Sequence, residues 1–179
     1  MDAAIAAGAA GVLAYGSNAS PVVLRRKLGG RAAAAVLAAP VVLADTDVVY
    51  SAHVSRHGAI PATIVSSPGT QVDAWLLAVP ASAIDVLDAT EPNYVRERAG
   101  HAHSVYLSRH GPLRVGGRPL ALADVPARGR ILPALTEAEL LEQVRLRLAS
   151  NDAPDRFVLA QIADERVRAA RSAALRLGL

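Results

Sequence analysis

The chain carries the stretch Val12-Leu13-Ala14-Tyr15-Gly16-Ser17-Asn18-Ala19-Ser20-Pro21, in which an apolar strand ends in a turn of small residues and a helix begins. Gly16 allows a turn with positive φ, and the two polar residues after it favour local hydrogen bonds over an extended strand. Ser20 is a good N-cap and Pro21 a good first helical residue. The free amides of such a turn can bind one carboxylate or phosphate, so the stretch predicts either an anion pocket or a strand-to-helix turn without a ligand.

The composition is typical of a globular protein with one core. The 179 residues are 52% hydrophobic and 20% charged, which favours a single domain over residues 1–179. The chain has no cysteine, which excludes disulfides, thiolate nucleophiles and cysteine-based metal sites. The opening residues 3–14 are too short for a membrane span and follow no basic residue, so we expect an irregular lead-in, no membrane contact and a cytoplasmic protein.

The net charge of +3 comes from arginine and does not predict nucleic-acid binding. In a helix expected over residues 164–177, four arginines are spread around the axis and no aromatic residue alternates with them. These arginines are Arg166, Arg168, Arg171 and Arg176. We expect them to lie on the solvated surface of the helix, and we expect no nucleic-acid partner.

Helix signals occur in several places along the chain. Pro21 begins a short helix that two glycines end after residue 28, and a second short helix is expected over residues 82–89. A capping box at Thr136–Glu139 opens a third helix. The helix over residues 164–177 is expected to bury four apolar residues, which are Val167, Ala170, Ala174 and Leu177.

Strand signals fill most of the space between these helices. The turn Ser67-Pro68-Gly69-Thr70 predicts a hairpin between two strands, residues 31–39 favour strand or irregular structure, and residues 112–132 favour turns and loops. Short strands with non-adjacent helices predict an α+β fold with a mixed or barrel-like sheet. The expected strands cover residues 41–43, 47–54, 61–67, 71–79, 94–98 and 101–109.

Three motifs occur in a fixed order along the chain. They read Tyr15-Gly16-Ser17-Asn18, Ser66-Ser67-Pro68-Gly69 and Val86-Leu87-Asp88-Ala89-Thr90-Glu91. Together they resemble the γ-glutamylcyclotransferase-like family, over about residues 12–107. The resemblance implies a small mixed β-barrel with surrounding helices and a pocket at one barrel mouth. The barrel core would cover about residues 12–110, and a helical C-terminal segment would cover about residues 134–179.

The resemblance also implies a reaction that needs no cofactor. The α-amino group of a γ-glutamyl amine or peptide attacks its own γ-carbonyl, which gives 5-oxoproline and releases the amine. Glu91 matches the general acid/base of the family, and its expected place beyond a helix C-terminus suits a base. The amides of Gly16, Ser17 and Asn18 would hold the α-carboxylate of the substrate. The further substrate-binding candidates are Tyr15 and Tyr94.

One position departs from the family pattern. Pro92 follows Glu91 where the family commonly has glycine, which fixes φ and removes a backbone donor. The loop after the base is therefore expected to be stiffer, and the substrate range to differ. Two functions stay open from the sequence, namely a γ-glutamyl cyclotransferase of the lyase or acyltransferase type and a non-catalytic module that binds a small molecule. The sequence indicates neither the leaving amine nor the oligomeric state.

Histidines offer two weaker alternatives. His53 and His57 are four residues apart, and His101 and His103 would share one face of a strand, but no carboxylate has ligand-like spacing with either pair, so no metal is expected. Ser17 with His57 could form a nucleophile and its base. The Gly-x-Ser-x-Gly pattern and a third acidic member are both missing from the sequence, which disfavours this site.

Overall fold

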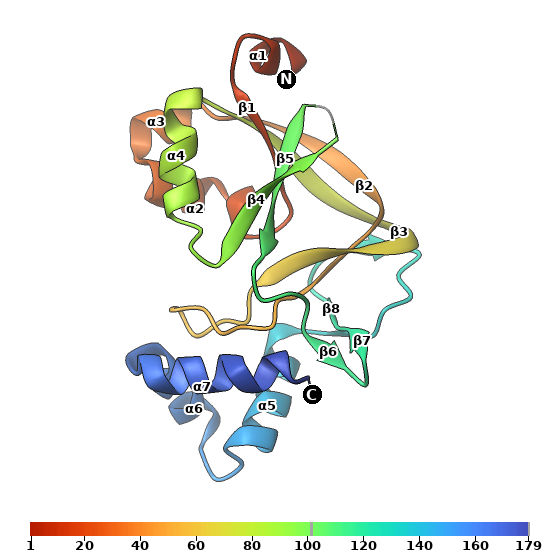
Figure 1. Cartoon of the computed structure of the whole chain (residues 1–179), viewed down its shortest axis with the longest axis vertical. Coiled ribbons are helices and arrows are strands. Elements are labelled where there is room, and N and C mark those ends of the chain that lie inside the picture. The colour runs from red at the N-terminus through yellow and green to blue at the C-terminus, as the bar shows by residue number, and fades with distance from the viewer. Residues whose placement is uncertain (101, 179) are drawn as a thin grey trace. The chain divides into compact units, whose positions relative to one another are not determined.

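The computed structural model describes residues 1–100 and 102–178, and the chain in it divides into two compact units (Figure 1). Unit 1 comprises Met1–Ala44 and Gln71–Arg109, and unit 2 comprises Asp45–Thr70 and His110–Leu179. Two long strands, β2 and β3, contribute residues to both units. They span Leu37–Tyr50 and Ala62–Val79. The single domain over residues 1–179 stays a prediction beside this division.

Unit 1 is built around β1, which spans Ala10–Ala14 and pairs antiparallel with β3 and parallel with β5. The strand β5 in turn pairs antiparallel with β4, and Val12, Leu77 and Leu87 are buried in the core beside them. The helices α3 and α4 both contact α2. The remaining bounds in unit 1 are β4 (Tyr94–Ala99), β5 (His103–Ser108), α1 (Asp2–Ala6), the 3-10 helix η1 (Ser17–Ala19), α2 (Pro21–Leu28), α3 (Gly30–Ala34) and α4 (Ala81–Ala89).

Unit 2 joins short strands to three C-terminal helices. The strand β8 pairs with β2 and β10, β9 pairs with β3, and β6 and β7 form a separate hairpin. Tyr50, Leu140, Phe157 and Leu175 belong to its buried core. The bounds are β6 (Arg114–Val115), β7 (Arg118–Pro119), β8 (Ala121–Leu122), β9 (Ala127–Arg128), β10 (Ala134–Leu135), α5 (Glu137–Leu148), α6 (Pro154–Ala163) and α7 (Glu165–Arg176).

Several local predictions are confirmed. The helix α2 begins at Pro21 and ends before Gly29, whose φ of 78° is the left-handed value that a glycine tolerates at a helix end. The helix α4 covers the predicted residues, and the α+β class is confirmed. The capping box is present, because the Thr136 side chain accepts from the Glu139 N–H and the Glu139 carboxylate accepts from the Thr136 N–H.

The expected β-barrel is not formed. Within residues 1–100 and 102–178 the strand order is β10-β8-β2-β3-β1-β5-β4, with β9 beside β3, so the sheet is open rather than closed. The edge strand β4 carries exposed Arg96, Glu97 and Arg98. Charged side chains of this kind keep an open edge in water and disfavour pairing with a further strand.

Three predictions near strands are wrong in whole or in part. Residues 30–34 form α3 and residues 2–6 form α1, because alanine favours helix where we expected irregular or extended chain. Residues 37–39 do belong to β2, as the expectation for residues 31–39 allowed. The predicted hairpin turn at residues 67–70 lies inside the continuous strand β3. Gly69 adopts φ 81° there and its N–H donates to Asp45 Oδ1 at 2.8 Å, so the positive φ serves a local irregularity of the strand rather than a reversal.

The buried face of α7 also differs from the predicted one. Arg171 and Leu175 are buried, whereas none of the four residues predicted to be buried there is, and Leu177 is 91% exposed. The Arg171 guanidinium lies 3.6 Å from the centre of the Phe157 ring and donates to Gln161 Oε1 at 2.9 Å. The expectation that Arg171 lies on the solvated surface is therefore wrong, because α6, which the sequence pattern did not predict, provides partners for its charge.

Candidate active site

The loop that follows β1 keeps the predicted strand-to-helix connection but changes its details. Gly16 has φ −127°, so the turn does not use a positive φ, and Ser20 stands at the N-cap of α2 without a capping hydrogen bond from its side chain. The turn is instead made by η1, in which Ala19 N–H donates to the Gly16 carbonyl at 2.9 Å. Pro21 is the first residue of α2, as predicted.

The first amides of this loop have no acceptor within the described part of the chain. A 3-10 helix leaves its first N–H groups without an internal partner. No protein acceptor is found for the N–H groups of Gly16, Ser17 or Asn18 among residues 1–100 and 102–178. These three donors are the ones that the sequence predicts for a substrate carboxylate.

The side chains of Asn18 and Glu91 meet, although they are 73 residues apart in the chain. Asn18 Nδ2 donates to Glu91 Oε1 at 2.8 Å, and the Lys27 ammonium donates to the same oxygen at 2.5 Å and to Asn18 Oδ1 at 2.7 Å. The side chains of Lys27 and Glu91 are only 13% and 12% exposed. Side chains from η1, from α2 and from the loop after α4 therefore form one closed hydrogen-bonded cluster, which we call the Glu91 cluster (Asn18, Lys27 and Glu91).

This cluster leaves half of the Glu91 carboxylate available. Both contacts use Oε1, and no partner for Oε2 is found among the residues that the structure describes. A carboxylate held through one oxygen keeps a fixed orientation while the other oxygen can accept a proton. Glu91 also lines a pocket of about 280 Å³, so this acid faces a space that a small molecule can enter.

Pro92 shapes the turn after Glu91. The Tyr94 N–H donates to the Glu91 carbonyl at 3.0 Å, which makes residues 91–94 a tight turn with Pro92 in its second position. Proline favours that position because its fixed φ matches the turn. The residue that departs from the family pattern therefore stabilises the loop that carries Glu91.

Aromatic and charged side chains line the rest of the pocket. Burial raises the pKa of Tyr94 and of Tyr106, so both hydroxyls remain protonated donors. Tyr106 donates to Asp88 Oδ1 at 2.6 Å, and Arg96 donates to both oxygens of the same carboxylate. The hydrogen bonds from Arg96 and Tyr106 hold the pKa of Asp88 below its usual value.

Arg109 is the least compensated charge of this pocket. Its Nε donates to the Tyr94 carbonyl at 3.1 Å, but it has no carboxylate partner in the part of the chain that the structure describes. Arg96 in the same pocket, by contrast, forms an ion pair with Asp88 at 2.8 Å. Among the described residues, the pocket therefore offers one carboxylate oxygen without a protein partner and one guanidinium without a counter-ion.

The structure brings together some of the predicted residues and adds others. Glu91, Asn18 and the loop amides belong to one region, and Tyr94 lines the pocket beside Glu91. The Tyr15 hydroxyl donates to the Tyr106 carbonyl oxygen, which points it to the backbone. Lys27 was not predicted. It is the only lysine in a chain with 19 basic residues, and that singularity was the available signal.

The histidine alternatives gain no support from the geometry. No group of three or more His, Asp or Glu side chains that could hold a metal occurs within residues 1–100 and 102–178. His53 is 2% exposed and its ring lies 4.5 Å from that of His110, which the sequence did not pair with it. His101 lies outside the described residues. None of the helices described in the structure is long and apolar enough to cross a membrane.

Comparisons with known proteins give matches only among solved structures. No family model matches the chain, and no curated protein matches its sequence. The chain resembles a γ-glutamyl cyclotransferase in structure. That match has 18% identity and a TM-score of 0.44, and it covers 57% of this chain and 68% of the other.

Two further solved structures match with similar TM-scores and over a similar share of this chain. A human protein described as uncharacterized has 19% identity and a TM-score of 0.43, with 56% of this chain and 66% of the other covered. An allophanate hydrolase of Kluyveromyces lactis has 8% identity and a TM-score of 0.42, with 57% of this chain and 18% of the other covered. At these identities the function has to come from the geometry of the site.

Proposed function

We propose that this protein cyclises a γ-glutamyl amine or peptide to 5-oxoproline and releases the amine, with Glu91 as general acid and base. The observation that carries the proposal is the Glu91 cluster. It sets a carboxylate with one available oxygen beside a loop whose first amides have no protein acceptor. One glutamyl unit has an α-ammonium next to an α-carboxylate, and these are the two groups that such an arrangement can bind.

Lys27 supports the choice of an ammonium as ligand. Its Nζ is bound by Glu91 Oε1 and Asn18 Oδ1, so the cluster already accommodates a primary ammonium. A substrate α-ammonium would bind the second carboxylate oxygen, Oε2, from the pocket side. The charge of Lys27 compensates Glu91 before the substrate arrives, which lowers the cost of keeping a largely buried carboxylate.

The reaction then requires the α-nitrogen to lose two protons. Glu91 Oε2 takes the first proton from the α-ammonium, and the resulting amine attacks the γ-carbonyl carbon to form the new C–N bond of the ring. Glu91 passes this proton to the leaving nitrogen as the bond between that nitrogen and the γ-carbon breaks. The ring nitrogen then gives up its second proton, which Glu91 passes to the released amine, so the products are 5-oxoproline and the amine in its ammonium form.

The pocket beyond Glu91 would receive the leaving amine. Tyr94 and Tyr106 supply protonated hydroxyls at its wall, and Arg109 supplies a positive charge without a counter-ion among the described residues. A leaving group with a carboxylate, such as an amino acid, suits this charge better than a cationic amine does. We therefore expect γ-glutamyl amino acids to be better substrates than γ-glutamyl derivatives of diamines.

The test is release of 5-oxoproline from a panel of γ-glutamyl amino acids and γ-glutamyl amines, measured by mass spectrometry. Glu91→Gln should lower the rate at least about a hundredfold, because it removes the proton carrier and keeps the size of the side chain. Glu97→Gln, an exposed acid on β4, is the matched control and should keep the rate within about twofold.

Two outcomes would overturn the proposal. Equal turnover by the Glu91→Gln variant would remove Glu91 from its role. If the unmodified protein releases no 5-oxoproline but binds a γ-glutamyl compound in calorimetry, the non-catalytic binding module is the correct function.

A further inference from the structure

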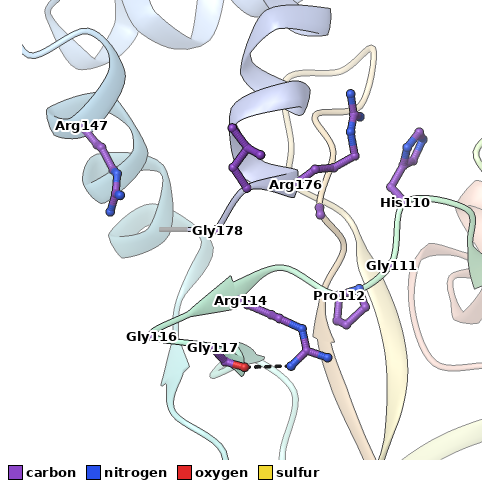
Figure 2. A pocket seen from close by; sticks show the side chains of 11 residues that line it. His110, Gly111, Pro112, Arg114, Gly116, Gly117, Arg147, Arg176 and Gly178 are labelled. Carbon is purple, nitrogen blue, oxygen red and sulfur yellow. Dashed lines mark hydrogen bonds between the residues drawn. The ribbon is translucent and has the colours of Figure 1, made fainter.

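A second pocket lies in unit 2, and none of its lining residues is among those proposed for the reaction. It has a volume of about 460 Å³ and is lined by the C-terminal ends of α5 and α7 and by the hairpin of β6 and β7 (Figure 2). This volume falls in the range of small-molecule sites. The chemistry of its lining shows what class of molecule would fit.

The charged residues of this lining have one sign. Arg114, Arg147 and Arg176 contribute three guanidinium groups, and no Asp or Glu is among the lining residues. Arg114 Nη1 donates to the Gly117 carbonyl at 2.8 Å, which holds its side chain against the hairpin turn. None of the three arginines has a carboxylate within 4.0 Å in the part of the chain that the structure describes.

Other arginines of the same unit do have such partners. Arg130 is paired with Asp47 at 2.8 Å and Arg145 with Glu142 at 2.6 Å. The three lining arginines differ from Arg130 and Arg145 in this respect. The carbonyl ends of α5 and α7 carry partial negative charge, so attraction of an anion must come from the guanidinium groups themselves.

A buried histidine lies beside this pocket. The His53 ring is 4.5 Å from that of His110, which lines the pocket. Burial is the main cause that lowers the pKa of His53 to about 4, and the charges of His110 and Arg176 act in the same direction.

The arrangement of the arginines indicates more than one anionic group. In Figure 2 Arg147 lies on the α5 side, Arg176 on the α7 side near His110, and Arg114 beside the Gly116–Gly117 turn. A single carboxylate has two oxygens and would engage one guanidinium fork, whereas linked phosphates present several charged oxygens over a longer span. We propose that this pocket binds a small molecule that carries two or more linked phosphate groups.

The test uses inorganic tripolyphosphate as the probe and isothermal titration calorimetry of the full chain at constant ionic strength. We expect Arg147→Gln and Arg176→Gln each to weaken binding about tenfold, because each removes one charge-assisted contact. Inorganic phosphate should bind at least about tenfold more weakly than tripolyphosphate. The control is Arg156→Gln, an exposed arginine of α6 that does not line the pocket, and it should leave the affinity unchanged.

Several results would overturn this proposal. These are the absence of heat at millimolar tripolyphosphate, an equal loss of affinity in the Arg156→Gln variant, or binding of citrate as tight as that of tripolyphosphate. Tighter binding of a short oligonucleotide, weakened equally by all three substitutions, would indicate a nucleic-acid surface instead. Thermal melting of each variant separates a loss of folding from a loss of binding. None of the variants changes a residue of the Glu91 cluster.

Discussion

The two pockets of this protein handle charge in opposite ways. In unit 1 the Glu91 cluster compensates its acid with Lys27, and Asp88 compensates Arg96, so most charges there have a partner at hydrogen-bond distance. In unit 2 the pocket between α5, α7 and the β6–β7 hairpin collects three arginines without a carboxylate in its lining. A compensated site can orient a reacting group, whereas an uncompensated one attracts a ligand of opposite charge. The difference suggests chemistry in the first pocket and recognition in the second.

The largest expected effect is a loss of stability when the carboxylate that pairs with Arg130 in unit 2 is removed. Asp47 is fully buried and accepts from both Nε and Nη2 of Arg130, so Asp47→Ala should lower the free energy of unfolding by about 4 kcal/mol by leaving a guanidinium unpaired. The double variant Asp47→Ala/Arg130→Met should recover part of this loss. Urea denaturation measures both. A loss below about 1 kcal/mol in the single variant would mean that this pair contributes little and that the contrast with the three lining arginines is weak.

The pH dependence of His53 is the next largest effect. Its pKa is about 4 in the folded chain and 6.5 in the unfolded one, so only the unfolded chain takes up the proton between these values. Stability is therefore fully present above pH 6.5 and falls by about 3 kcal/mol as the pH drops to 4. NMR titration of His53 measures the pKa directly, and Arg176→Gln should raise it slightly.

The exposed His57 is the control for the pH dependence attributed to His53. His57 is exposed and should make no comparable contribution, so His57→Gln should keep the pH dependence that His53→Gln removes. A pKa of His53 near 6.5 in the folded protein would show that burial and the neighbouring positive charges do not disfavour its protonation as described.

A smaller loss of stability is expected in unit 1 when Lys27 is replaced. Lys27→Met should cost about 2 kcal/mol of stability, because the largely buried Glu91 carboxylate loses its closest partner. Lys27→Arg should restore only part of it, since a planar fork does not reproduce the single-point contacts with Asn18 and Glu91. The control is Arg26→Met on the same helix, which is exposed. Equal stability of Lys27→Met and the unmodified protein in thermal unfolding would show that the cluster is not compensated as described.

The smallest expected effect is a change of KM when Arg109 is replaced. Among the described residues, Arg109 is the charged residue of its pocket that has no partner of opposite charge. If it contacts an anionic leaving group, Arg109→Gln should raise KM for a γ-glutamyl amino acid about tenfold and leave kcat within about twofold. The KM for an uncharged γ-glutamyl amine should not change. Steady-state kinetics on both substrates makes the comparison. An equal rise of KM for the two substrates would mean that Arg109 supports the loop through the Tyr94 carbonyl rather than the substrate.

The local elements could be predicted because their signals lie within a few residues. Pro21 and Gly29 delimit α2, and Thr136 with Glu139 forms a capping box, so backbone stereochemistry and short-range hydrogen bonds determine these helices. From the sequence, Gly69 indicated only a turn. Inside β3 its N–H donates to the Asp45 side chain, which is distant in the sequence.

The candidate site, too, was determined partly by local sequence and partly by contacts between elements. The sequence by itself determined the strand, the turn of small residues and the helix over residues 10–28, and the motif resemblance singled out Glu91. Only the tertiary structure decided that Asn18 and Lys27 share one oxygen of Glu91, that Arg171 is buried on Phe157, and that three arginines surround one pocket. Local patterns report the backbone preference of neighbouring residues, whereas pairing and burial of charge depend on contacts between elements that the chain order does not specify.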